Sequence, residues 1–278
     1  MTDRIETLPD GSLIQHGPYN NRIYLMKAGK EAVEDLPETL IGRARESGYT
    51  KIFAKVPGAL EGRFLDAGYV REAMIPFFYN RGDDGVFLGC FLDERRAEEP
   101  EREKLDGIVR LARAEAAVPW QRENCGFPLR QCGEADTAEM AELYRRVFPS
   151  YPFPIHDPAY LQTTMRGNIV YFAAIADGKM VALSSSETDP ESSSVEMTDF
   201  ATLPEWRGNR LGCHLLAAME RAMRGRGIRT ACTIARAASA GMNITFARLG
   251  YRFAGRLRNN TNISGGIESM NVWYKPLT

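Results

Sequence analysis

Apolar and polar residues follow alternating strand and helix periods through the second half of the chain. Apolar positions recur at Met140, Leu143, Tyr144 and Val147, which is the spacing of one helix face, and Asp136 or Thr137 can cap this helix. Period-two segments with a turn at Gly178 predict a hairpin. The complete prediction is strand 128–132, helix 136–148, strands 169–177, 180–188 and 195–203, helix 210–227, strand 228–234, helix 240–250, and strands 251–257 and 268–275. Prolines interrupt the segment 151–160, and a further helix is predicted from Leu161 onward.

The first half repeats part of this order. It predicts strand 22–28, helix 33–46, strand 51–57, a short helix 61–68, and strands 69–79 and 85–92, with residues 15–17 as a turn without a catalytic role. Aligning Phe64–Tyr69 with Phe246–Tyr251 places Phe91 opposite Trp273 without a gap. The pattern indicates a half-sized copy of the later fold, and a chance match of strand and helix order is the alternative. Helices inserted between strands also imply a locally parallel strand pair.

A change in composition marks the boundary between the two halves. Charges of alternating sign run from Asp93 to Lys104, as in a solvated linker. A helix follows with Leu105, Ile108, Leu111 and Ala112 on one face, and Pro119 ends it. We therefore predict an N-terminal domain at 1–97, a linker and helix at 98–121, and a second domain at 122–278.

Charge and residue counts narrow the classes of partner. The 278 residues contain 35 Lys+Arg and 36 Asp+Glu, so the balance gives no reason to expect a nucleic-acid partner. No apolar run reaches membrane-spanning length, and the first residues lack a signal-peptide core. Five cysteines without a C-x-x-C pair and three dispersed histidines favour a reduced cytoplasmic protein without a metal site. The sequence leaves the oligomeric state open.

One loop between a predicted strand and helix has the composition of an anion site. The segment from Leu203 to Cys213 places Arg207, Gly208, Arg210 and Gly212 directly before the helix. The start of a helix has unpaired N–H groups and a partial positive charge, and glycine lets the backbone approach an anion closely. A turn with solvated arginines is the alternative for such a loop taken alone. The strand before it and the helix after it favour a phosphate seat.

This loop and the later segment 246–253 resemble the GNAT acetyltransferases, whose acetyl-CoA pyrophosphate sits on a loop of the form Q/R-x-x-G-x-G/A. Arg207 fills the first position and Gly212 the second glycine, whereas Arg210 stands where the first glycine is usual. The resemblance implies an α/β GNAT fold with a mixed, mainly antiparallel sheet. It also implies a cofactor site that contains Phe200, Ala201, Thr202, Arg207, Gly208, Asn209, Arg210, Leu211, Gly212, Cys213, Ser239 and Phe246.

Segments spread over nearly the whole chain are similar to the β-lysine N-acetyltransferases. They are residues 14–27, 48–57, 151–158, 196–205, 259–265 and 270–275. This resemblance implies acetyl transfer from acetyl-CoA to the side-chain amine of β-lysine, which gives the osmolyte Nε-acetyl-β-lysine. Another small cationic amine such as a polyamine or lysine, and a non-catalytic acyl-CoA sensor, are the alternatives.

Two carboxylates on strand 195–203 are the candidates for the catalytic base. An alkylammonium with a pKa of ~10.4 is only ~0.04% neutral at pH 7, so acetyl transfer needs a proton acceptor or desolvation of the amine. Strand alternation places Glu196 with Thr198, Phe200 and Thr202, and it places Asp199 on the opposite face. We predict Glu196 as the base, with Asp199 as its rival and a structural ion pair as the alternative for both.

The remaining site residues follow from the family resemblance and from loop composition. The resemblance implies an oxyanion donor at a backbone N–H near Ala201 or Thr202. Phe246 stands where many GNAT enzymes have the tyrosine that protonates the thiolate, so Tyr251 or Tyr144 substitutes or the thiolate leaves unassisted. Ser239 stands where the family often has Asn. The predicted substrate-binding residues are Tyr151, His156, Asp157, Asn259, Asn260 and Asn262, with capping, core packing or turn formation as alternatives.

Overall fold

The computed structural model describes residues 3–29, 35–79, 82–117 and 125–277. Its strands form one sheet with the order β1-β2-β3-β4-β6-β5-β12-β13-β11-β10-β9-β8-β7. The strands are β1 Arg4–Thr7, β2 Leu13–Gly17, β3 Arg22–Lys27, β4 Lys51–Pro57, β5 Val70–Ile75, β6 Gly85–Phe91, β7 Leu129–Gln131, β8 Ile169–Ala176, β9 Lys179–Asp189, β10 Ser194–Thr202, β11 Thr230–Arg236, β12 Arg252–Ile263 and β13 Gly266–Pro276. The α-helices are α1 Leu36–Glu46, α2 Glu61–Asp66, α3 Glu94–Ala97, α4 Arg102–Glu115, α5 Thr137–Val147, α6 Pro158–Arg166, α7 Leu211–Gly225 and α8 Ala240–Arg248.

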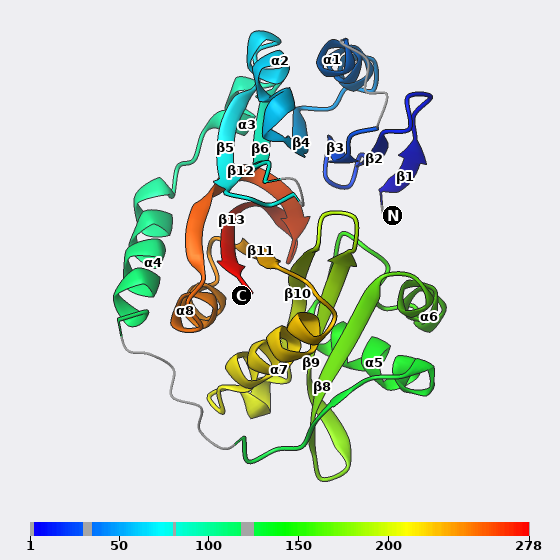
Figure 1. Cartoon of the computed structure of the whole chain (residues 1–278), viewed down its shortest axis with the longest axis vertical. Coiled ribbons are helices and arrows are strands. Elements are labelled where there is room, and N and C mark those ends of the chain that lie inside the picture. Colours follow the sequence, from blue (N-terminus) through cyan, green and yellow to red (C-terminus); the bar gives the residue numbers. More distant parts are fainter. Residues whose placement is uncertain (1–2, 30–34, 80–81, 118–124, 278) are drawn as a thin grey trace.

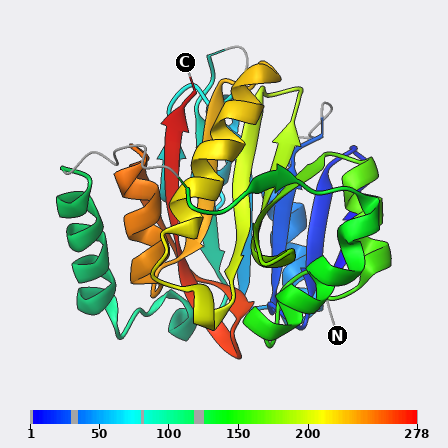
Figure 2. The ribbon, with the colours of Figure 1, turned by 90° about the horizontal axis from the view of Figure 1, so that it is seen from below.

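Helices cover both faces of the C-terminal half, which comprises β7–β13 with α5–α8. Alternate residues of β8 separate the two layers, because Val170 and Phe172 pack in the cluster under α7 while Tyr171 and Ala173 pack in the cluster with α5 and α6. Figure 2 shows α7 lying along the strands, with α8 and α4 beside it. The face opposite α7 is the one that carries Tyr171.

The N-terminal half, β1–β6 with α1 and α2, repeats the strand order of the C-terminal half. In each half a parallel pair separated by a helix is followed by two antiparallel strands: β3-β4-β6-β5 in the first and β10-β11-β13-β12 in the second. Figure 1 shows the two halves one above the other, with β5 and β12 where they meet. This arrangement supports the half-copy over a chance match. The domain limits 1–97, 98–121 and 122–278 stay a prediction, and Pro119 lies outside the described residues.

The two halves join where Gly255 of β12 pairs with Ala73 of β5. Gly255 has a φ of 151°, and a Cβ there would lie 2.2 Å from the carbonyl oxygen of Glu72. Only glycine allows this approach without displacing backbone. Beside it, the buried Lys51 ammonium pairs with Glu72 at 2.7 Å and donates to the carbonyl of Arg258 at 2.6 Å. A close backbone contact and the hydrogen bond from Lys51 to Arg258 thus fix one half on the other.

Most predicted elements are confirmed, and the differences have local causes. The segment predicted as a turn at 15–17 lies in strand β2, which pairs with β3, and β1 was missed as well. In α4 the predicted Leu105 and Ala112 are buried, whereas Leu111 is exposed and Val109, which was not predicted, is buried. Helix α1 is described from Leu36; residues 33 and 34 lie outside the described chain.

Candidate active site

A wedge opens between β10 and β11 beyond Glu196. The parallel pairing of these strands covers only Ser194–Glu196, which confirms the predicted parallel pair, whereas β11 continues along β13 to Arg236. On its other side β10 contains a bulge between Thr198 and Ala201, where Asp199 has a positive φ of 55°. Backbone N–H groups after Glu196 are therefore available to a ligand that enters the wedge.

The bulge overturns the predicted alternation at Asp199. Met197 packs under α7, on the face opposite Glu196, but Asp199 accepts hydrogen bonds from the hydroxyls of Ser185, at 2.6 Å, and Tyr151. Ser185 is the register partner of Thr198, so Asp199 lies on the same side as Glu196 and not opposite to it. Beyond the bulge the phase is shifted, because Phe200 contacts Phe246 on the α7 side and Ala201 packs with α5. An inserted residue changes the face of every residue after it.

Helix α7 begins beside this wedge with an open N-terminus. Gly208 and Arg210 both have positive φ, 91° and 55°, which turns the chain sharply into the helix. The N–H groups of Leu211 and Gly212 have no backbone acceptor in the described chain. Arg207 is exposed and makes no hydrogen bond or ion pair with the described residues. A Cβ at Gly212 would make an ordinary contact with Thr245 at 3.8 Å, so the free protein has room for one at this position.

A cavity of about 550 Å³ connects the α7 loop with the wedge and with Asp199. Of the predicted site residues it is lined by Tyr151, Asp199, Phe200, Thr202, Arg207, Gly208, Arg210, Leu211, Gly212, Ser239 and Phe246. Arg236, Met242 and Thr245 also line it and were missed by the sequence analysis. Arg236 is held by a two-pronged ion pair with Glu268, at 2.9 and 2.6 Å. Its place at the end of β11 was the one signal that could have pointed to it.

The wall made by α8 is fixed by the fully buried Asn243. Its amide nitrogen donates to the carbonyls of Arg236 and Ser239, at 3.0 and 2.8 Å. Its oxygen accepts from Asn271 and from the indole of Trp273, each at 2.8 Å. All of its hydrogen-bonding capacity is used, so the start of α8 is held rigidly against β11 and β13.

Glu196 belongs to an acidic row on the face opposite α7. It does not line the cavity itself but lies two residues before Thr198, which does. Its register partner on β9 is Glu187, and its partner on β11 is Cys232. Directly opposed strand residues have Cβ atoms ~5 Å apart, so two carboxylates lie side by side here, with Asp199 on the same side.

Burial and like charge make these carboxyls weak acids. Burial first, then Glu187, raises the pKa of Glu196 to about 7, with Asp199 adding to the shift and Lys55 opposing it. Burial also raises the pKa of Glu187 and that of Asp199, where the Ser185 and Tyr151 hydroxyls act in the opposite direction. A carboxyl with a pKa near 7 is suited to accept a proton at neutral pH and to release it again.

Several predicted residues lie away from the cavity. Asp157 is exposed and caps α6 by accepting from the Ala159 amide at 2.9 Å, and His156 beside it has a buried Nε2 without a hydrogen-bond partner in the described chain. Ala201 and Cys213 are buried in the cores on either side of the sheet, and Asn209 turns its amide back to the carbonyl of Trp206. The hydroxyls of Tyr144 and Tyr251 are buried, and neither residue lines the cavity.

The three asparagines lie in β12 and contact the N-terminal half, not the cavity. Asn259 donates to the carbonyls of Arg96 and Glu98, and Asn262 donates to that of Tyr19 at 2.8 Å. Asn260 is buried, and its carbonyl accepts from Arg22. The segment was predicted as a loop, but β12 continues through Ile263, so these side chains join the halves.

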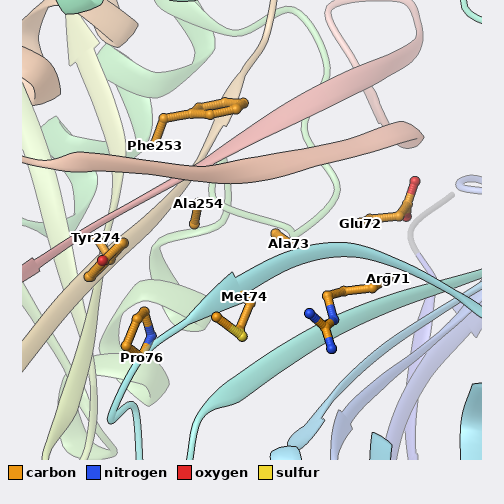
Figure 3. Close-up of a pocket in the computed structure, with 8 residues that line it drawn as sticks. All are labelled: Arg71, Glu72, Ala73, Met74, Pro76, Phe253, Ala254 and Tyr274. Atoms are coloured by element: carbon orange, nitrogen blue, oxygen red, sulfur yellow. The ribbon is translucent and has the colours of Figure 1, made fainter.

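A second hollow of about 330 Å³ lies between β5 and the β12–β13 pair (Figure 3). Met74 and Pro76 face Tyr274 across it, as Figure 3 shows. Tyr274 on β13 is the register partner of Cys232, which is in turn the partner of Glu196, so Tyr274 lies in line with the acidic row. In the part of the chain that the structure describes, no cluster of His, Cys, Asp or Glu could hold a metal. No helix within the described ranges is long and apolar enough to span a membrane.

The fold and the site together define an N-acetyltransferase of the GNAT class. The sequence pattern described as "Acetyltransferase (GNAT) family" matches residues 137–251, from α5 to the start of β12. The chain belongs to this family, as relatives along nearly its whole length also show.

Three of these relatives are curated acetyltransferases. The chain is 39% identical to the β-lysine N(6)-acetyltransferase of Methanococcus maripaludis, over 95% of this chain and 96% of that protein. It is 32% identical to the N-acetyltransferase YodP of Bacillus subtilis, over 96% of both. It is 33% identical to the β-lysine N(6)-acetyltransferase of Methanosarcina mazei, over 72% of this chain and 73% of that one.

Solved structures match about half of the chain, at lower identity. The ribosomal-protein-S18-alanine N-acetyltransferase of Escherichia coli is 18% identical, with a TM-score of 0.48, over 55% of this chain and 94% of that one. A phosphinothricin acetyltransferase of Sinorhizobium meliloti, solved in complex with AcCoA, is 20% identical, with a TM-score of 0.47, over 54% of this chain and 88% of that one.

Proposed function

We propose that this enzyme transfers the acetyl group of acetyl-CoA to the side-chain (ε) amine of β-lysine and so forms Nε-acetyl-β-lysine, an osmolyte. The observation that supports this most is one cavity that runs from the open start of α7 to the carboxylate of Asp199. Two relatives that share most of the chain bear the name of this activity. Carboxylates in the interior suit a substrate that brings ammonium groups.

The diphosphate of acetyl-CoA would bind at the start of α7. The N–H groups of Leu211 and Gly212 and the side chain of Arg207 provide donors and positive charge there. The pantetheine arm would then enter the wedge between β10 and β11. A free N–H beyond the bulge, near Ala201 or Thr202, would donate to the thioester oxygen as negative charge develops on it.

In the chemical step Glu196 would take a proton from the substrate ammonium, directly or through water, and the neutral nitrogen would attack the thioester carbon. The carbon–nitrogen bond forms, the carbon–sulfur bond breaks, and the sulfur leaves with the bonding electrons. The attacking nitrogen then gives up its second proton, which the departed thiolate takes up from the site or from water, so the products are the neutral amide and the CoA thiol. A thiol with a pKa of about 8.5 is stable enough as a thiolate to leave unassisted. Asp199, held by Ser185 and Tyr151, would position the ammonium near Glu196.

Purified enzyme with acetyl-CoA and a panel of amines tests this proposal. We expect thiol release with β-lysine, little with lysine or spermidine, and a product acetylated at the terminal nitrogen by mass spectrometry and NMR. A preference for spermidine would show that the substrate is a polyamine and not β-lysine. Tight CoA binding without turnover of any amine would identify an acyl-CoA sensor instead.

A further inference from the structure

Lys55 of the N-terminal half faces the acidic row of the C-terminal half. It lies on β4 two residues after Phe53, so both side chains point to the same face. Phe53 packs in a cluster that joins the halves and includes Cys232, the register partner of Glu196. The ammonium of Lys55 interacts electrostatically with Glu196 and Glu187 without forming an ion pair with either carboxylate.

The ammonium of Lys55 has no bonded partner, unlike the other interior lysine of this strand. Lys51, four residues earlier on the same face, donates to Glu72 and to a carbonyl oxygen. Lys55 makes no hydrogen bond and no ion pair with any described residue, although it is largely buried. Burial lowers the pKa of Lys55, but the surrounding groups, the carboxylate of Glu196 among them, outweigh burial and raise that pKa above its usual value. A charged, unbonded ammonium in the interior is costly unless an anion joins it.

A second unpartnered group points to the same place. Tyr24 on β3 is only 9% exposed, and its hydroxyl makes no hydrogen bond within the described chain. Tyr24 interacts electrostatically with Lys55, Glu196 and Glu187, so its hydroxyl lies among them. The hydroxyl of Tyr24 is not fully enclosed, so it can hydrogen-bond to a ligand group that reaches this cluster. Lys55, Glu187 and Glu196 each remain partly accessible, so the cluster borders open space.

We propose that Lys55 and Tyr24 bind the carboxylate of the amino-acid substrate, while Glu187 binds the amine next to that carboxylate. The reacting amine then lies at Glu196 and Asp199, toward the wedge. Three carboxylates and one ammonium match a substrate with two ammoniums and one carboxylate. This inference rests on the proposed function for the reacting end. It gives the N-terminal half, which lacks the Arg/Gly loop, a direct role in substrate recognition.

The test compares each amino acid with its decarboxylated analogue. Acetylation of β-lysine and 1,4-diaminopentane, and of lysine and 1,5-diaminopentane, is measured as kcat/KM for wild type, Lys55→Met, Lys55→Arg and Tyr24→Phe. We expect Lys55→Met to lower the preference for the carboxylate-bearing amine by about 10- to 100-fold, mainly through KM, because a charge-assisted contact is lost. Lys55→Arg should restore part of this preference. Lys104→Met, an exposed lysine on α4, is the matched control.

Each outcome decides between the proposals. If wild type turns over β-lysine and Lys55→Met keeps the same preference as Lys104→Met, the carboxylate subsite is wrong and the proposed function stands. If wild type acetylates the diamines as well as the amino acids, the subsite is also wrong. If wild type prefers lysine to β-lysine, and Lys55→Met loses the preference for lysine over 1,5-diaminopentane, the carboxylate subsite stands and the substrate is lysine. If no amine is acetylated, both proposals fall. Unfolding midpoints and CoA affinity show whether Lys55→Met is folded, and Tyr24→Phe provides an independent measurement if it is not.

Discussion

Replacing Glu196 by glutamine tests the proposed base most directly. The change keeps the size of the side chain and removes its ability to accept a proton. The reacting ammonium, with a pKa of ~10.4, is only ~0.04% neutral at pH 7, and an enzymatic general base typically contributes about 10²- to 10⁴-fold. We therefore expect kcat/KM of Glu196→Gln to fall by about 10²- to 10³-fold at pH 7.5, with CoA affinity unchanged, because Glu196 does not line the cavity.

The pH profile separates this role from a structural one. Glu196 has a pKa of about 7, so its ionised fraction rises about tenfold between pH 6 and pH 8. Wild-type kcat/KM for β-lysine should rise by that factor and then level off. The variant lacks the internal base, so its activity should continue to rise with pH as free amine accumulates toward a pKa of ~10.4.

Thiol release from acetyl-CoA, followed from pH 5.5 to 9.5, provides both profiles, and calorimetric titration provides the CoA affinity. Asp199→Asn is the matched comparison on the same strand. If Glu196→Gln keeps the wild-type profile within threefold while Asp199→Asn loses the rise near pH 7, Asp199 is the base and the assignment to Glu196 is wrong.

Four further predictions concern electrostatics, the cofactor loop and the junction of the halves. Glu187→Gln removes a like charge beside Glu196, so the rise in kcat/KM should move to lower pH; an unmoved profile would contradict the proximity argument. Glu196 has a pKa of about 7 in the folded protein and ~4.3 in the unfolded chain, so its protonation stabilises the fold fully below pH ~4.3, and this stabilisation is lost as pH rises through about 7. Glutamine stays neutral, so the free energy of urea unfolding of Glu196→Gln should exceed that of wild type at pH 8 but not at pH 4. Gly212→Ala fits the free protein and favours helix, so its unfolding midpoint should hold or rise while CoA affinity falls about tenfold; unaffected affinity would place the phosphates elsewhere. Gly255→Ala should lower the free energy of unfolding by about 2 kcal/mol or more, because its Cβ overlaps backbone of the other half, and wild-type stability would refute that contact.

Local sequence signals determined most of the C-terminal fold. The Arg/Gly loop before α7 could be predicted because strand, turn and helix signals follow one another within about 25 residues, and helix starts bind anions whatever their surroundings. Strands β8–β11 and helix α8 followed from apolar periodicity in the same way. The family resemblance then supplied Ser239 and Phe246, which do line the cavity.

Tertiary structure decided which side chains share the interior. Asp199 joined the face of Glu196 because of a bulge set by pairing with β9, and no local pattern announces such an insertion. Asn259 and Asn262 were predicted as substrate-binding residues of a loop between two strands, but they lie within β12, where Asn262 contacts the N-terminal half. Lys55 is 141 positions before Glu196, and only the joining of two similar half-sheets brings them together. The periodicity of apolar residues shows which face of a helix or strand is buried. What that face packs against is decided by contacts between distant segments of the chain.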